Sequence, residues 1–406
     1  MEEEEDVALA ACIQFLETHT QQQQLGTEIR KLLDQKEWEK TASLLVDALI
    51  AAFNDPPPEK RDDINYEESL EGCVQVILNF IFSNQVDKHQ LILLAQQLRQ
   101  SEPFGPLRLR TVTRLYNALP ETKETLQKLD LFILTVQVAS KVNMLQALAP
   151  AFSRIEGFLD IWSPSKQDRR RVYQTITEAF DETNHQAQAF EFHVKLLETF
   201  NGENEDMLSS IEPYAVKACK EAIRQPKLFR FDELLDLDAI QRLKNTKEHA
   251  LLFELLQIFV SDKLEAFVDY VARNREYFDR AGFDYEACLN KMRLLSLASL
   301  GVEHSEIPYA LAANTLQIEQ DMLEHWVIEA VRLGLMEAKI DQMSQVIRVI
   351  RASQRVFVKE HWHSLQKRLQ VCRSNVSQLI ATIDQVRQQH LPAVSSSSSS
   401  SLLTNP

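Results

Sequence analysis

The segment from residue 284 to residue 355 constrains the fold of this 406-residue chain more than any other segment. It contains three short stretches with helical periodicity: one through Met292, one that opens near Pro308, and one over residues 319–333. Proline suits a first helical turn because its missing N–H would have no partner inside the helix. The segment therefore begins with three consecutive amphipathic helices.

Two strand-like runs follow these helices. Gly334 is expected to end the third helix in a left-handed conformation, and residues 335–340 and 345–350 are rich in residues that suit a pleated surface. Asp341 and Gln342 supply a polar break between the runs, which predicts a hairpin. Three helices followed by a hairpin are the order of a winged helix.

Many winged helices bind nucleic acid through the third helix, but the charges of this one disfavour phosphate. Its acidic residues are Glu319, Asp321, Glu324 and Glu329. Arg332 is its only base, so phosphate would be repelled. Residues 284–392 hold 12 basic and 12 acidic residues, so no basic field compensates. We expect protein contact and no direct sequence-specific binding of nucleic acid.

The first 280 residues show helical periodicity almost throughout, with few strand signals and only 8 Gly in the whole chain. Apolar stripes run through Val172, Ile176, Ala179 and Phe180, through Ala187, Phe190, Val194 and Leu197, and through Leu252, Leu255, Leu256 and Phe259. A helical pair exposes its apolar face when alone, and stacked pairs bury such faces continuously. The fold class is therefore mostly α: a right-handed helical-repeat array (α-solenoid), a winged-helix subdomain and a long C-terminal helix.

Composition and turn signals divide the chain into six expected parts. They are an acidic N-terminal segment with the first helix (1–20), the helical-repeat array (21–225), helical hairpins (226–283), the winged helix (284–355), a C-terminal helix (356–391) and a disordered Ser-rich tail (392–406). Residues 55–58, 103–106 and 163–165 carry prolines that predict loops. The C-terminal helix carries a long apolar stripe that needs a partner, either its own domain or helices of other chains.

The sequence argues against catalysis. It contains no phosphate-binding GxxxxGK[ST] loop, no GxGxxG, no GxSxG and no HExxH. His361 and His363 resemble the start of a metalloisopeptidase zinc motif, but the further ligand positions hold Val371 and Ser374. We expect no enzyme activity, no metal and no cofactor. Residues 169–171 are three arginines, for which pairing with carboxylates is favoured over phosphate binding.

Charge and cysteine content bear on location. The net charge is −15, and residues 1–100 hold 19 acidic and 8 basic residues, which discourages binding to anionic membranes. The start is acidic, unlike a secretory leader, and no apolar run approaches the roughly 18 residues of a membrane span. The five cysteines form no CxxC pair and are expected to be reduced core residues. A cytoplasmic protein is the simplest inference.

Three core and turn segments carry a family resemblance. They read PKLFRFDELL (226–235), LLQIFVSDKL (255–264) and KMRLL (291–295). Together with helical repeats that end in a winged helix, they resemble the M subunits of eukaryotic translation initiation factor 3, a family of PCI-domain proteins. The resemblance covers roughly residues 110–390.

The resemblance implies a non-enzymatic scaffold subunit. Its partners would be the other subunits of translation initiation factor 3 and, through that complex, the 40S small ribosomal subunit. In PCI complexes, winged helices align edge to edge and C-terminal helices gather into a bundle. A PCI subunit of the COP9 signalosome or proteasome lid stays an alternative, and a winged-helix nucleic-acid-binding regulator is a weaker one.

These implications select two sets of candidate interaction residues. The first is the second strand of the hairpin, expected to lie at a sheet edge with free backbone groups; its residues are Val346, Ile347, Val349 and Ile350. About half of these must belong to the core instead, because side chains alternate across a strand. The second set is the stripe of the C-terminal helix, with Trp362, Leu365, Leu369, Val376 and Leu379.

Overall fold

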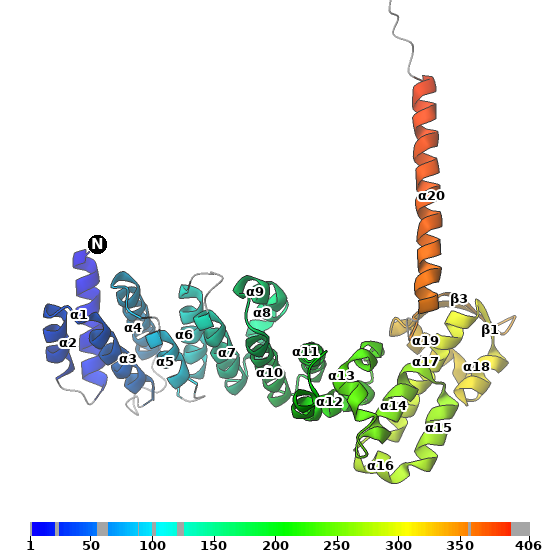
Figure 1. Cartoon of the computed structure of the whole chain (residues 1–406), viewed down its shortest axis with the longest axis horizontal. Helices are drawn as coiled ribbons and strands as arrows, with labels where there is room; N and C mark the ends of the chain where they lie inside the picture. Colours follow the sequence, from blue (N-terminus) through cyan, green and yellow to red (C-terminus); the bar gives the residue numbers. More distant parts are fainter. Residues whose placement is uncertain are drawn as a thin grey trace, which may run out of the picture. The chain divides into compact units, whose positions relative to one another are not determined.

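The computed structural model describes residues 2–20, 24–54, 64–87, 89–99, 103–119, 126–355 and 359–390 (Figure 1). Side chains are described within these ranges except at 2–6, 64, 126, 359–365, 368 and 387–390. The chain forms two compact units, residues 1–259 with 266–289 and residues 260–265 with 290–406. The predicted loop at 55–58 and the predicted Ser-rich tail lie outside the described residues.

Up to residue 283 the described regular elements are helical. They are α1 (Glu2–His19), α2 (Leu25–Asp34), α3 (Trp38–Asn54), α4 (Ile64–Ser83), α5 (His89–Gln97), α6 (Gly105–Ala118), α7 (Leu126–Lys141), η2 (Leu145–Leu148), α8 (Ala149–Phe152), α9 (Ile155–Trp162), α10 (Lys166–Glu182), α11 (Gln186–Glu198), α12 (Glu205–Arg224), η3 (Asp232–Asp236), α13 (Asp238–Leu243), α14 (Ala250–Ser261), α15 (Leu264–Arg273) and α16 (Arg275–Arg280).

Successive helices of the first unit pack on one another, as the predicted array requires. α3 contacts α4, α6 contacts α7, and α10 contacts both α7 and α11, which in turn contacts α12. The predicted stripe on α10 is buried. On α11 the buried face is broader than the predicted stripe, because it also takes in Phe192 and His193, whereas Ala187 is exposed.

The predicted hairpin of α14 and α15 is also present. Leu252 and Leu256 on α14 are fully buried. The rings of Phe259 and Phe267 meet edge to face with centroids 5.5 Å apart, and the Tyr270 hydroxyl donates a 2.8 Å hydrogen bond to the Leu251 carbonyl. These contacts fasten the two helices along their length.

The C-terminal part contains the winged helix. Its elements are α17 (Tyr285–Glu303), β1 (Glu306–Pro308), α18 (Tyr309–Leu316), η4 (Gln320–Met322), α19 (Leu323–Arg332), β2 (Met336–Asp341), β3 (Val346–Ala352) and the long helix α20 (Lys359–His390). Pro308 occupies the N-cap position of α18, and Gly334 follows α19 with a φ of 72°. Both agree with the prediction, so the fold class is confirmed.

The position of β3 in the sheet corrects one expectation. The strand order is β1-β3-β2, and β3 pairs antiparallel with both neighbours. The predicted edge strand is therefore the central strand, and β1 and β2 form the edges. The prediction was wrong because it overlooked β1, whose residues Glu306 to Pro308 pair with Arg348 to Val346 and satisfy the backbone groups that were expected to be free.

The winged-helix core lies between the helices and this sheet. Ile307 and Ile347 face each other across β1 and β3 and are both fully buried. Leu323, Val327 and Ala330 bury one face of α19. Across the described part of the chain, no helix combines the length and the apolar character that crossing a bilayer requires.

Candidate protein-interaction site

The four candidate residues of β3 differ in exposure. Ile347 belongs to the core, Val346 and Val349 are half-buried, and Ile350 is 58% exposed. This division agrees with the expectation that about half of the set faces inward. Ile350 is thus the member most available to a partner, and the docking role of the set stays a prediction.

Further apolar side chains of the winged helix are exposed. Met322 and Ile328 are at least half exposed, and Met343, in the turn between β2 and β3, is 97% exposed. Val331 recurs in the sequence at helical spacing with Leu323 and Val327, but its side chain is 40% exposed.

The charged groups around this surface are largely paired with one another. Arg332 donates two hydrogen bonds to Glu329, at 2.8 and 2.6 Å. On the sheet, Arg348 lies 3.3 Å from Glu306 and 3.4 Å from Asp341. Because these cations already have carboxylate partners, this surface offers phosphate little free positive charge.

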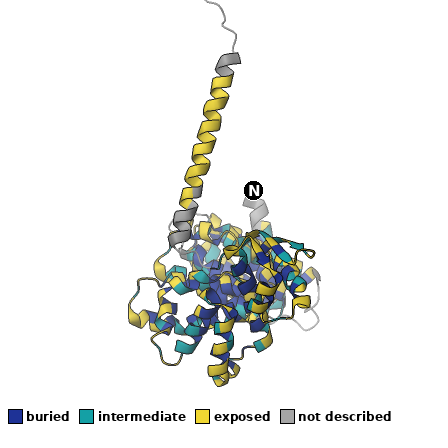
Figure 2. Cartoon of the chain, turned by 90° about the vertical axis from the view of Figure 1, so that its right-hand side faces the viewer, coloured by how far each residue is buried: buried dark blue, intermediate teal, exposed yellow. Residues whose placement is uncertain are grey.

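The helix α20 presents an extensive exposed apolar surface. Every side chain described on it, from residue 366 to residue 386 apart from 368, is exposed (Figure 2). The exposed apolar residues are Leu369, Val371, Val376, Leu379, Ile380, Ile383 and Val386. The prediction that all five cysteines are core residues was wrong for Cys372, which is exposed on this helix, whereas the other four cysteines are buried as predicted. Trp362 and Leu365 lie on this helix, but their side chains are outside the described part.

The three arginines at 169–171 are paired with carboxylates, as the sequence favoured. Arg169 lies 3.6 Å from Asp160, and Arg170 lies 2.7 Å from Glu203. Arg171 lies 3.1 Å from Asp130. Arg169 also lines a cleft of about 660 Å³ beside α9, α10 and α11.

That cleft carries charges of both signs. On its wall Tyr173 donates its hydroxyl hydrogen to Glu156, at 2.8 and 2.9 Å from the two carboxylate oxygens, and Lys195 lies 3.7 Å from Glu156. Glu156 thus accepts the Tyr173 hydroxyl hydrogen and pairs with the Lys195 ammonium group.

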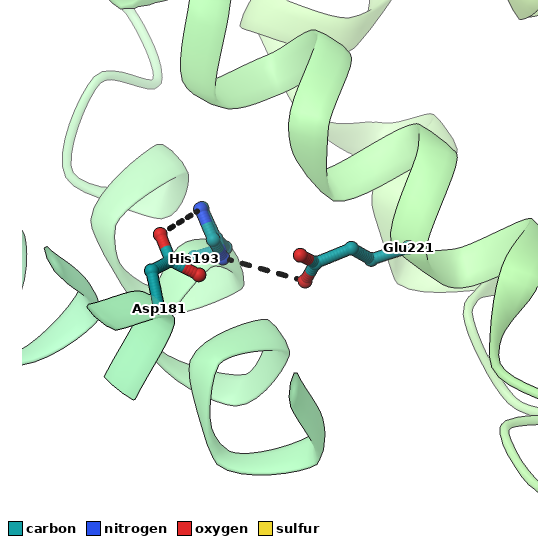
Figure 3. A group of neighbouring side chains, drawn as sticks. All are labelled: Asp181, His193 and Glu221. Atoms are coloured by element: carbon teal, nitrogen blue, oxygen red, sulfur yellow. Dashed lines mark ion pairs between the residues drawn. The ribbon is translucent and has the colours of Figure 1, made fainter. Parts of the chain in front are cut away.

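A buried polar cluster joins three successive helices of the first unit (Figure 3). Asp181 lies near the end of α10, His193 lies in α11 and Glu221 lies in α12. His193 has no exposed side-chain surface; its Nε2 lies 3.8 Å from Asp181 Oδ2 and its Nδ1 lies 3.9 Å from Glu221 Oε2. Sequence reasoning missed the cluster because its members are far apart in the chain and match no ligand motif.

Burial dominates the ionisation of this cluster. It lowers the pKa of His193, whereas the charge of Asp181 opposes that shift. Burial and the charge of Asp181 both raise the pKa of Glu221, to about 7. Lys217 lies 2.5 Å from Asp181 and supplies the nearest positive charge.

A model of the PCI domain matches residues 253–351, from α14 to β3. "Eukaryotic translation initiation factor 3 subunit M" of Dictyostelium discoideum is 32% identical over 328 residues, which are 79% of this chain and 80% of that protein. The chain belongs to the subunit M family of eukaryotic translation initiation factor 3.

Other members of the subunit M family match over most of their length. The protein of Chaetomium globosum is 25% identical over 366 residues, covering 88% of this chain and 83% of its own. That of Nematostella vectensis is 26% identical over 316 residues, covering 76% and 81%. The resemblance inferred from the core and turn segments is therefore confirmed, and the PCI match contains the hairpin and the winged helix described above.

Proposed function

We propose that the chain is a non-catalytic scaffold subunit of translation initiation factor 3 that joins other subunits through α20 and the winged helix. The observation that carries this proposal is the exposed apolar stripe of α20. Its members Leu369, Cys372, Val376, Leu379, Ile383 and Val386 alternate at spacings of three and four residues. This is the spacing of a seam that packs against another helix.

An unpartnered stripe of this kind is unfavourable in water. Leu379 is 62% exposed and Ile383 is 63% exposed. Fully burying a Leu or Ile side chain contributes about 1.5–3 kcal/mol, so covering these two alone would stabilise a complex by roughly 2–4 kcal/mol. A bundle with helices of other subunits would bury the whole stripe, whereas the winged helix would contribute a smaller contact around Ile350.

The biological role follows from the family. The scaffold would support assembly of initiation complexes on the small ribosomal subunit through the other subunits, which requires residence in the cytoplasm. In this role the chain itself neither contacts the ribosome nor catalyses a reaction.

The proposal is tested by replacing Leu379 and Ile383 together with Glu in the full chain. Tagged protein is captured from cells, and the captured subunits are identified by mass spectrometry. We expect the wild type to capture other subunits of translation initiation factor 3 and the double variant to lose at least tenfold of them.

The matched control is Ser374→Glu with Ala381→Glu. These residues are exposed on the same helix and lie on the side opposite the stripe. They add the same charge without touching the seam, so assembly should persist. Equal assembly of both double variants would refute the role of α20, and capture of signalosome or proteasome-lid subunits would refute the assignment to translation initiation.

A further inference from the structure

We propose that Asp181, His193 and Glu221 bind a divalent transition-metal ion of the zinc class, which would tie α10, α11 and α12 together. Each residue offers one ligand atom, and these atoms all lie within 4.8 Å of one another. Imidazole nitrogen and carboxylate oxygen are the ligands by which proteins hold zinc. Nothing in the docking role of α20 depends on this site.

The tautomer of His193 directs a lone pair toward the cluster. Its Nδ1 lies 2.8 Å from the carbonyl oxygen of Ala189, one turn earlier in α11. Since a carbonyl only accepts, Nδ1 carries the hydrogen and donates it, which leaves the lone pair on Nε2 of the neutral ring. A backbone carbonyl that fixes the other ring nitrogen in this way is typical of histidines that bind metals.

Two acceptor atoms in the cluster are buried without a hydrogen-bond partner. They are His193 Nε2 and Glu221 Oε2. The Nε2 atom also lies 3.8 Å from Asp181 Oδ2, so the lone pair of the imidazole ring faces a carboxylate oxygen that is itself an acceptor. Unsatisfied buried acceptors are costly, and a cation among them would satisfy both.

The distances are compatible with a bound ion after a small contraction. Bonds of about 2.0–2.2 Å from zinc to nitrogen and oxygen place ligand atoms roughly 3–4 Å apart. The present distance from Nε2 to Asp181 Oδ2 already falls in that range. Glu221 approaches from the Nδ1 side of the ring (Figure 3), so its side chain would have to turn toward Nε2.

Lys217 is the competitor for this position. Its ammonium group lies 2.5 Å from Asp181 Oδ2, yet its side chain is 45% exposed. It can therefore move into solvent when an ion binds. This arrangement makes a distinctive prediction: removal of Lys217 should strengthen metal binding, whereas removal of His193 should abolish it.

The test uses the purified full chain, stripped with a chelator and then freed of it. Zn²⁺ is titrated by calorimetry, and Co²⁺ is titrated by its visible absorption, which reports nitrogen and oxygen ligands. We expect one ion per chain, loss of at least tenfold in affinity for His193→Gln, and a gain of several-fold for Lys217→Met. His325→Gln, which removes an exposed histidine of α19, should leave binding unchanged.

Circular-dichroism melts accompany every titration. If His193→Gln fails to fold, Lys217→Met still decides the matter, because its side chain is largely exposed. Stoichiometric binding with these changes supports the site. The proposal is overturned if the folded wild type binds no ion at 100 µM; a proton shared among the three side chains would then be the only cation in this cluster. It is also overturned if Lys217→Met leaves the affinity for the ion unchanged or lowers it.

Discussion

Gly301 lies on α17, where the helix packs against β3 and β2 of the winged helix. A Cβ atom at this position would lie 2.9 Å from the Cβ of Ala352 and 3.4 Å from Cγ1 of Val349. The Ala352 methyl is attached directly to the backbone of β3, so it cannot swing aside. Gly301→Ala therefore requires α17 and β3 to separate.

The magnitude follows from two opposing effects. Overpacking of a core costs about 1–3 kcal/mol, whereas replacing Gly with Ala inside a helix gains roughly 0.5–1 kcal/mol. We expect Gly301→Ala to destabilise the winged helix by about 0.5–2 kcal/mol. Gly72, inside α4, has no atom within 4 Å of the added Cβ, so Gly72→Ala should stabilise its surroundings by about 0.5–1 kcal/mol.

Hydrogen exchange measured by mass spectrometry is the suitable assay, because a chain with two compact units need not unfold in a single step. Peptides from β3 should exchange faster in Gly301→Ala, and peptides from α4 should exchange more slowly in Gly72→Ala. The packing argument would be refuted if both substitutions protected their own regions equally, since helix propensity alone would then account for both.

Three further predictions concern single side chains. Ile350→Asp should weaken capture of partner subunits without changing the thermal melt, whereas Val349→Asp should lower the melting temperature because Val349 is half-buried; unchanged capture and melting for both would contradict the assignment of β3. In chelator, the folded pKa of Glu221 is about 7 and its ordinary value is 4.5, so the folded state holds a proton more tightly and loses stability as pH rises through that window. The free energy of opening of α12, measured by hydrogen exchange of its peptides, should therefore be equal in Glu221→Gln and the wild type below pH 4.5 and roughly 3 kcal/mol higher in Glu221→Gln above pH 7; a pH-independent difference would rule out this ionisation. Tyr270→Phe should destabilise α14 and α15 by about 1 kcal/mol in the same assay, because the Leu251 carbonyl loses its donor, and unchanged exchange of their peptides would show that this bond does not stabilise the hairpin.

The sequence predicted the winged helix because several local signals agreed. Pro308 marked the start of α18 and Gly334 marked the end of α19, and two runs of β-favouring residues were separated by a polar turn. The first strand escaped notice because three residues, one of them Pro308, are too few to show an alternating pattern. Without β1, the central strand β3 was mistaken for an edge strand. The pairing of β1 with β3 sets the position of β3 in the sheet, and the local sequence pattern does not contain that pairing.

The buried cluster illustrates a different limit of sequence reasoning. His193 lies among apolar residues of α11, and its two carboxylate neighbours are contributed by other helices. Periodicity places a residue on a face of its own helix, but the partner of that face depends on the packing of three helices. The candidate stripe of α20 needed no such information, since its spacing alone predicts the seam.

The two candidate surfaces should differ in their share of the assembly energy. On β3, Ile347 is already buried in its own domain, which leaves Ile350 as the most exposed apolar residue of that strand. On α20, all the described side chains are exposed, so every residue of the stripe can still gain from burial. Because apolar stabilisation scales with the area removed from water, the double substitution of Leu379 and Ile383 should weaken capture of partner subunits more than Ile350→Asp. The reverse order would place the main contact on the winged helix and leave α20 as a secondary one.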